Sequence, residues 1–329
     1  MSNRKWSFGL IVLVLIFGYV LLRFFSSTVK VDDLVQQMEQ NNTENTSIKH
    51  VVLIAQELDN PFWREMQQGA DEAAAKLGMK IDYMGPIRIH PPEQMKLLEK
   101  SIAARPDAIL VQGINDPDYD LLIGKAIDQG IPVITVDADE PGSRRLAYVG
   151  TDNREAGIQM GKLLVKDADG SGRIGVMIGS ELADNQRLRL EGFRSIISAA
   201  PGFEIVDVRS SNISRIGAAK QAEAMLSERS GIDIIVGFSA LDAAGILEGV
   251  KAARKEAVRI YGFDDLETTR KSIAQGEVMA SIVQQPREMG AQSIHLLDQL
   301  FKGKKLSAQH FIDTYILDRE QMEFGGSGR

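Results

Sequence analysis

From residue 48 onward, short apolar runs alternate with longer amphipathic segments. Turn residues bound the apolar runs, as in strands buried on both faces of a parallel sheet. The longer segments have apolar residues at helical spacing, and several end at Gly or Pro, where helices commonly stop. The first series predicts strands at 51–55, 80–84, 108–112, 132–136 and 147–150, and helices at 64–77, 93–104, 119–129 and 152–165.

The same order restarts near Gly172. The second series predicts strands at 173–178, 204–208, 233–238, 258–262, 278–283 and 314–317, and helices at 185–199, 216–228, 242–253, 266–274 and 287–301. Residues 52–60 also resemble 176–185 with one residue inserted, and a helix containing Gly69 or Gly192 follows each stretch. We therefore predict an α/β fold with two similar lobes, each a doubly wound parallel sheet, and a cleft between them.

A different pattern precedes this region. Two basic residues stand before an apolar run at 8–22, which continues past Arg23 into two phenylalanines. The run has the length of a signal-peptide core, but 26–28 offer no good cleavage site and Arg23 can reach the membrane surface. We interpret 1–28 as an uncleaved transmembrane helix, with the N-terminus inside and the globular part extracytoplasmic.

Residues 29–47 are then expected to form a stalk and a polar linker. Within this stretch Val31, Leu34, Val35 and Met38 fall at helical spacing. This spacing fits a short helix that pairs with another chain, and it equally fits a frayed helix on the membrane surface.

The composition of the chain excludes several kinds of partner and reactive site. The chain has 329 residues, a formal net charge of −7 and no cysteine. The charge argues against a nucleic-acid partner, and the lack of cysteine excludes disulfides, thiolate metal sites and a Cys nucleophile. The four histidines (His50, His90, His295 and His310) show no metal-ligand spacing. We expect no metal, no cofactor and no enzymatic activity.

One motif match is rejected on its context. Residues 170–175 fit G-x-G-x-x-G, but the dinucleotide fingerprint must follow a strand and open a helix. Here the glycines precede a predicted strand, so the match indicates a turn.

Polar and aromatic residues gather where the predicted strands end, which is the edge at which open α/β sheets bind ligands. Asn60, Phe62 and Trp63 follow the first strand, at the start of its helix. Both rings could belong to the core. Two adjacent aromatic residues cannot easily both point inward from one turn, so we expect at least one to face a ligand.

Other strand ends add charged groups. Asp137, Asp264 and Gln284 end or follow predicted strands, and Arg189 lies on the helix after 181–184. Asp265 we interpret as a helix N-cap. Carboxylates that accept from hydroxyls, a guanidinium that donates and a ring that covers an apolar face are what a sugar site requires.

Several segments together resemble the type I periplasmic binding proteins, in particular their ribose-binding-protein-like sugar-binding group. They are D-N-P-F-W at 59–63, I-P-V-I-T-V-D at 131–137, R-L-E-G-F at 189–193, Y-G-F-D at 261–264 and I-V-Q-Q-P at 282–286. The resemblance covers 48 to about 317. It implies a three-strand hinge near 150–151, 284–285 and 313–314, an N-terminal lobe of 48–151 and 285–313, and a C-terminal lobe of 152–284 and 314–329.

The resemblance also implies which residues bind the ligand. The matching positions are Asn60, Phe62, Trp63, Asp137, Arg189, Asp264 and Gln284. Three positions depart from the family pattern: Ala138 replaces an arginine, Ile213 an aromatic residue and Ser239 an asparagine. These departures put ribose itself in doubt and leave another pentose, a hexose or a polyol open.

We therefore expect a membrane-anchored sugar receptor that closes on a monosaccharide and signals to a membrane partner such as a histidine kinase. The alternative is a tethered solute-binding protein of a sugar ABC transporter, whose partner would be the permease. A repressor of the same fold would need a helix-turn-helix before the module, where the apolar run stands instead.

Overall fold

The computed structural model describes residues 18–19, 23, 30, 48–181 and 183–324. Most of the predicted anchor and stalk, 1–47, therefore lies outside the described residues. Within the described part of the chain, no helix combines the length and apolar character that a membrane crossing requires.

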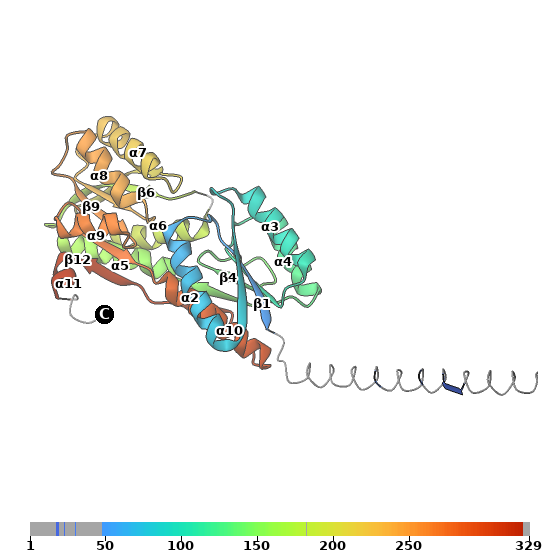
Figure 1. The fold of residues 1–329 in the computed structure, drawn as a ribbon. Helices are drawn as coiled ribbons and strands as arrows, with labels where there is room; N and C mark the ends of the chain where they lie inside the picture. The colour runs from blue at the N-terminus through green and yellow to red at the C-terminus, as the bar shows by residue number, and fades with distance from the viewer. Residues whose placement is uncertain (1–17, 20–22, 24–29, 31–47, 182, 325–329) are drawn as a thin grey trace, which may run out of the picture. The chain divides into compact units, whose positions relative to one another are not determined.

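The N-terminal lobe is built on a six-stranded parallel sheet of order β11-β5-β4-β3-β1-β2 (Figure 1). Its strands are β1 (Lys49–Ile54), β2 (Met79–Met84), β3 (Ala108–Val111), β4 (Val133–Val136), β5 (Ala147–Gly150) and β11 (Gln309–Phe311). Its helices are α2 (Pro61–Leu77), α3 (Pro91–Ala104), α4 (Pro117–Asp128) and α10 (Pro286–Phe301). One core lies between the sheet and α2 and α10, and a second lies under α3 and α4.

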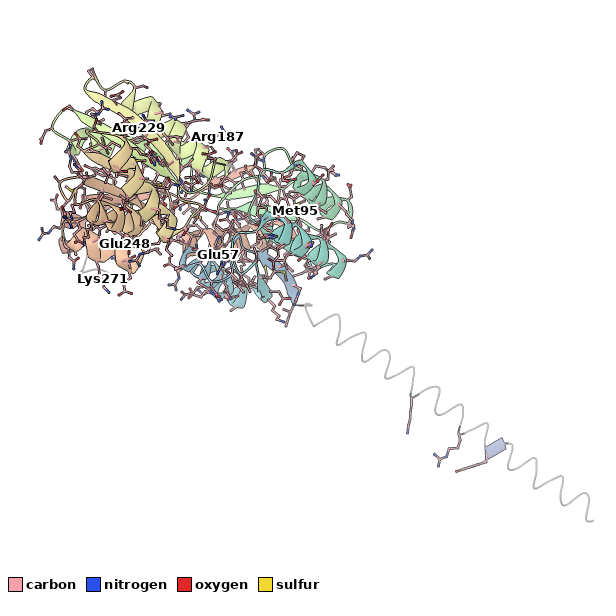
Figure 2. All side chains as sticks on the ribbon, turned by 90° about the horizontal axis from the view of Figure 1, so that it is seen from above. Glu57, Met95, Arg187, Arg229, Glu248 and Lys271 are labelled. Atoms are coloured by element: carbon pink, nitrogen blue, oxygen red, sulfur yellow. The ribbon has the colours of Figure 1, made fainter. Side chains whose placement is uncertain are left out.

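The C-terminal lobe repeats this plan with the order β12-β10-β9-β8-β6-β7. Its strands are β6 (Gly172–Ile178), β7 (Phe203–Ser210), β8 (Ile234–Gly237), β9 (Arg259–Phe263), β10 (Ala280–Val283) and β12 (Tyr315–Asp318). Its helices are α5 (Asn153–Asp167), α6 (Asp184–Ile197), α7 (Arg215–Glu228), α8 (Asp242–Ala252), α9 (Glu267–Ala274) and α11 (Arg319–Phe324). Helices α5 and α6 cover one face, and α7 and α8 cover the other. Figure 2 shows the two lobes, with Met95 on one and Arg229, Glu248 and Lys271 on the other.

Each lobe receives one helix from the far side of the hinge. Helix α10 follows β10 of the C-terminal sheet but lies against α2 in the N-terminal lobe (Figure 1). Helix α5 follows β5 and lies against α6 in the other lobe. In both pairs the backbones touch: a Cβ at Gly69 would collide with the Arg287 carbonyl, and one at Gly192 with the Arg154 carbonyl. Glycine at these positions is therefore what lets the helices approach so closely.

The chain passes between the lobes after β5, after β10 and between β11 and β12. Side chains link these crossings. Thr151 Oγ1 donates to Gln284 Oε1 at 2.9 Å, and Gln285 Nε2 donates to the Asp313 carbonyl at 2.8 Å. The two-lobe α/β architecture predicted from the sequence is thus confirmed.

Some local predictions were wrong. The C-terminal sheet is not wholly parallel, because β12 runs antiparallel to β10. The short elements β11 and α11 were missed, since three residues of β11 give no periodicity to detect. Asp265 is not an N-cap. Helix α9 begins at Glu267 after Leu266 without a side-chain cap, and Asp265 instead accepts from Arg270 Nη1 at 2.5 Å.

Candidate functional site

A polar cavity lies where the carboxyl ends of the strands of both sheets meet. All nine residues singled out from the sequence line it: Asn60, Phe62, Trp63, Asp137, Arg189, Ile213, Ser239, Asp264 and Gln284. The remaining lining residues are Gln56, Gln112, Ala183, Asn185, Gln186 and Ala240. The structure thus brings together residues from most of the chain's length. Their roles toward a ligand stay predictions.

The aromatic wall comes from the start of α2. Asn60 is the N-cap: its Oδ1 accepts from Phe62 N at 3.0 Å, and its Nδ2 donates to Glu57 Oε2 at 3.1 Å. Pro61 holds the first helical position, where a missing N–H leaves no bond unmade. The rings of Phe62 and Trp63 meet edge to face, with centroids 5.9 Å apart and planes at 77°. Trp63 is buried in the core, whereas Phe62 is partly exposed, so Phe62 is the ring more available to a ligand.

Two carboxylates enter from matching strand ends. Asp137 directly follows β4 and Asp264 directly follows β9, and both are buried. Asp137 Oδ2 accepts from Gln112 Nε2 at 2.5 Å. Both carboxylate oxygens of Asp264 accept from Gln284 Nε2 at 3.1 Å. The amides of Gln112 and Gln284 therefore fix the orientation of both acceptors.

Arg189 of α6 is the one cation of the cavity lining. It is 1% exposed, and its guanidinium lies over the Phe263 ring, 4.0 Å from the centroid. Its nitrogens donate to Asn153 Oδ1, the Phe238 carbonyl and Gln284 Oε1, each at 2.8 Å. Such a network fixes the guanidinium before any ligand arrives.

The charges in the cavity influence one another. Burial raises the pKa of Asp264 to about 6, against the charge of Arg189, which lowers it. Burial also raises the pKa of Asp137, and Arg189 again opposes the rise. Burial lowers the pKa of Arg189, whereas the two carboxylates raise it. The cavity therefore favours a neutral polyhydroxy ligand whose hydroxyls can both donate and accept, because two carboxylates face one guanidinium.

Two buried oxygens in the lining find no hydrogen-bond partner among the described residues. They are Gln112 Oε1, from the N-terminal lobe, and Ser239 Oγ, from the C-terminal lobe. A buried polar atom without a partner is costly, so each is suited to bond a ligand hydroxyl.

Ile213 adds an apolar contact in a strained backbone. Its φ is 49°, which a β-branched residue rarely adopts. Its N–H donates to the Gly179 carbonyl at 3.0 Å, and a Cβ at Gly179 would lie 2.8 Å from Ile213 Cγ1. The glycine thus makes room for the aliphatic side chain beside the cavity.

Sequence reasoning missed several lining residues. Gln112 directly follows β3, so the rule that identifies Asp137 also applies to it, but the sequence pattern predicts Gln112 inside the strand. Asn185 stands where the repeat aligns with Asn60 and could have been found in the same way. Gln186 gave no signal, because its side chain accepts from Gly179 N, a contact that only the fold creates.

Comparison with known proteins settles the family. Residues 51–305 match the model of the family described as "Periplasmic binding protein domain". This chain belongs to the periplasmic binding protein family. The match covers both lobes and all residues that line the cavity.

Within this family the chain is similar to GanP, a glucose-galactose binding protein from Geobacillus stearothermophilus. The two are 34% identical, with a TM-score of 0.82 over 84% of this chain and 99% of GanP. The structure of the XylFII-LytSN complex matches at 32% identity with a TM-score of 0.78, over 83% of this chain and 98% of the other. The ribose import binding protein RbsB of Escherichia coli is 25% identical over 82% of this chain and 90% of its own length. GanP and RbsB are named as binding proteins, so the prediction that this chain is not an enzyme is confirmed.

Proposed function

We propose that this periplasmic binding protein binds a neutral monosaccharide, a pentose or a hexose, in the cavity between its lobes. The observation that carries the proposal is the pairing of buried, oriented acceptors and donors with an aromatic wall. Asp137 and Asp264 accept from ligand hydroxyls, Arg189 donates, and Phe62 covers an apolar face of the ring. The relatives named for ribose and for glucose and galactose support this ligand class.

The mechanism is a shift between open and closed arrangements of the lobes. The aromatic wall belongs to the N-terminal lobe, whereas Arg189 belongs to the C-terminal lobe. A sugar contacts both only when the lobes approach, so it binds the closed state more tightly and raises its population.

Calorimetry of the full chain in detergent, against a panel of pentoses, hexoses and polyols, tests the proposal. We expect saturable binding of at least one sugar, with a matching rise in thermal stability. Folded protein that binds none of the panel would contradict it.

We further propose that residues 1–28 anchor the protein in the membrane and that it reports the bound state to a membrane partner such as a histidine kinase. The apolar run at 8–22 supports the anchor, and the relative XylFII, solved in complex with LytSN, supports a protein partner. Extraction of cell membranes with carbonate tests the anchor. The intact chain should stay in the pellet, and a chain lacking 1–28 should not.

A second candidate is a solute-binding protein of a sugar ABC transporter. The similarity to a ribose import binding protein favours it. A gene deletion separates the two functions. Loss of labelled-sugar uptake supports transport, whereas loss of the sugar-dependent transcriptional response with uptake intact supports signalling.

A further inference from the structure

Two loops of the N-terminal lobe carry polar residues of the cavity. Gln112 opens the loop that follows β3, and Asp137 opens the loop that follows β4. The loops touch close to the cavity, where Gly113 N donates to the Ala138 carbonyl at 2.8 Å. The positions of Gln112 and Asp137 therefore depend on how firmly the two loops are joined.

A buried carboxylate outside the cavity lining completes the junction. Glu140, in the loop after β4, is 3% exposed. Its Oε2 accepts from the backbone N–H of Ile114 at 2.7 Å and from that of Asn115 at 2.8 Å. Both N–H groups belong to the loop that begins at Gln112, so Glu140 bonds one loop to the other.

The rest of its own loop holds Glu140 in place. Its N–H donates to Asp139 Oδ1 at 2.8 Å, and its carbonyl accepts from Ser143 Oγ at 2.7 Å. Asp139 is in turn held by Arg145, whose Nε and Nη2 each donate to it at 2.5 Å. Bonds within its own loop thus hold the backbone of Glu140, while its carboxylate bonds to the other loop.

This position opposes the charge of Glu140. Burial raises its pKa to about 7, and the carboxylates of Asp120 on α4 and Asp184 on α6 act in the same direction. The two backbone N–H bonds act in the opposite direction and favour the ionised form. Since the pKa in the folded state exceeds the ordinary value of 4.5, the stabilising contribution is present below pH 4.5 and is lost as the pH rises through about 7. Ionised Glu140 therefore lowers the stability of the fold.

Among the residues that the structure describes, the C-terminal lobe shows no equivalent bridge. Glu267 stands three residues after Asp264, as Glu140 stands three after Asp137, but Glu267 is exposed and its pKa is lowered by Lys271. There the loop after β8 is instead bonded by its own helix, because Ser239 N donates to Asp242 Oδ2 at 2.9 Å. Glu267 is therefore a matched control for Glu140.

We propose that Glu140 is a positioning residue of the ligand site, which joins the loops after β3 and β4 and thereby sets Gln112 and Asp137 against the ligand. The proposal rests on the proposed function of the cavity. It assigns a role to a carboxylate that does not line the cavity.

The test compares Glu140→Gln and Glu267→Gln in the full chain. Glutamine keeps an oxygen acceptor for the two N–H groups but removes the charge, so the dissociation constant for the best sugar should rise about tenfold. Glu267→Gln should leave it unchanged. The melting temperature of Glu140→Gln at pH 8 should equal or exceed that of the wild type, which loss of a merely structural residue would not produce.

A pH profile adds a second readout. Wild-type affinity should fall as the pH is lowered through about 7, because protonation weakens the bonds to Ile114 and Asn115. Glu140→Gln should lack this step. The titratable groups that act on Glu140 are Asp120 and Tyr119 on α4, Asp184 on α6 of the other lobe, and Asp139 with Arg145 on its own loop. If affinity instead rose on acidification, and only with Glu140 present, repulsion from Asp184 would dominate and the positioning role would be refuted.

Hydrogen exchange separates this proposal from the proposed function. Without sugar, the amides of Ile114 and Asn115 should exchange faster in Glu140→Gln than in the wild type. Unchanged exchange together with unchanged affinity would overturn the positioning role. If the wild type bound no sugar, the proposed function would fail, while faster exchange would still establish the bridge and unchanged exchange would refute it.

Discussion

The two lobes present one carboxylate each through the same backbone device. Asp137 and Asp264 follow equivalent strands, and both adopt the left-handed conformation, with φ of 63° and 61°. In each case a hydroxyl of the neighbouring strand donates to the aspartate's carbonyl: Tyr148 Oη at 2.7 Å in one lobe, and Ser281 Oγ at 2.6 Å in the other. The repeat therefore preserves the turn that aims the carboxylate, although the supporting residue differs.

What surrounds the two carboxylates is not repeated. Asp264 is bonded by Gln284, a hinge residue that also accepts from Arg189. Asp137 is bonded by Gln112, from its own lobe. Hydrogen bonds thus connect Asp264 to the hinge and, through Gln284, to Arg189. Asp137 is instead connected to the neighbouring loop of its own lobe. The comparison teaches that the fold determines where the two carboxylates lie, whereas the surrounding side chains determine which other groups each carboxylate interacts with.

Removal of Arg189 should have the largest effect on this arrangement. Arg189→Met removes the charge that acts on the buried carboxylates of Asp137 and Asp264, and it removes three hydrogen bonds of a charged group, each typically worth about 1.5–3 kcal/mol. We expect sugar binding to be lost and the free energy of unfolding in urea to fall by a similar amount. Arg187→Met, an exposed arginine on the same helix (Figure 2), is the control and should change neither. Retained binding in Arg189→Met would show that the cation is not a ligand contact.

Replacement of the two aspartates should weaken sugar binding to different extents. Asp137→Asn and Asp264→Asn each remove a charge-assisted bond, which is worth about 1.5–3 kcal/mol of binding free energy. We expect Asp264→Asn to be the more severe, because it also disturbs Gln284 and, through it, Arg189. Calorimetry of both single variants and the double variant measures the difference. If the two single variants lost equal binding free energy, and the double variant lost the sum of the two, the proposed connection of Asp264 to the hinge would be contradicted.

The sequence predicted the lobes and the edge where the site lies, because apolar periodicity and strand-end polar residues are local signals. Asp137, Asp264 and Gln284 could be found in this way. The bonds that join them could not, since Gln284 meets Arg189 only after two segments far apart in the sequence come together in the C-terminal lobe. The same limit explains Asp265, which pairs with Arg270 and not with a helix N-terminus.

Burial of charge was equally hidden from the sequence. Glu140 stands in a polar stretch, D-A-D-E-P-G-S-R-R, which has the composition of an exposed turn. Only the fold shows that its side chain is enclosed and bonded to a second loop. Glu267 stands at the matching position of the other lobe and is exposed, so residue type alone does not distinguish the two acids.

The pH dependence of binding sharpens the comparison further. Burial raises the pKa of Asp264 to about 6, above its ordinary value of 3.8, so its stabilising contribution is full below pH 3.8 and is lost as the pH rises through about 6. Ligand hydroxyls need the ionised carboxylate as an acceptor, so affinity should change in the opposite direction and fall as the pH drops below about 6. Thermal unfolding and calorimetry from pH 4 to pH 8 measure both trends. In Asp264→Asn, the change near pH 6 should disappear from the curves of both melting temperature and affinity against pH. If this variant kept the wild-type curves, another group, such as Asp242, would be the cause of the change.

The smallest effect concerns the aromatic wall, which has no counterpart among the described lining residues of the C-terminal lobe. Phe62→Leu keeps an apolar side chain but removes the ring face, and we expect its contact with a sugar to contribute about as much as an aromatic pair does, roughly 0.5–1.5 kcal/mol beyond buried area. We expect affinity to fall roughly threefold to tenfold with little change in melting temperature, because Phe62 lies at the edge of the core and not inside it. Phe301→Leu is the matched control: Phe301 is partly buried against the same core as Phe62 and lies outside the cavity lining, so its replacement should leave affinity unchanged. Equal effects of the two substitutions would mean that the ring of Phe62 supports the fold and does not contact the sugar.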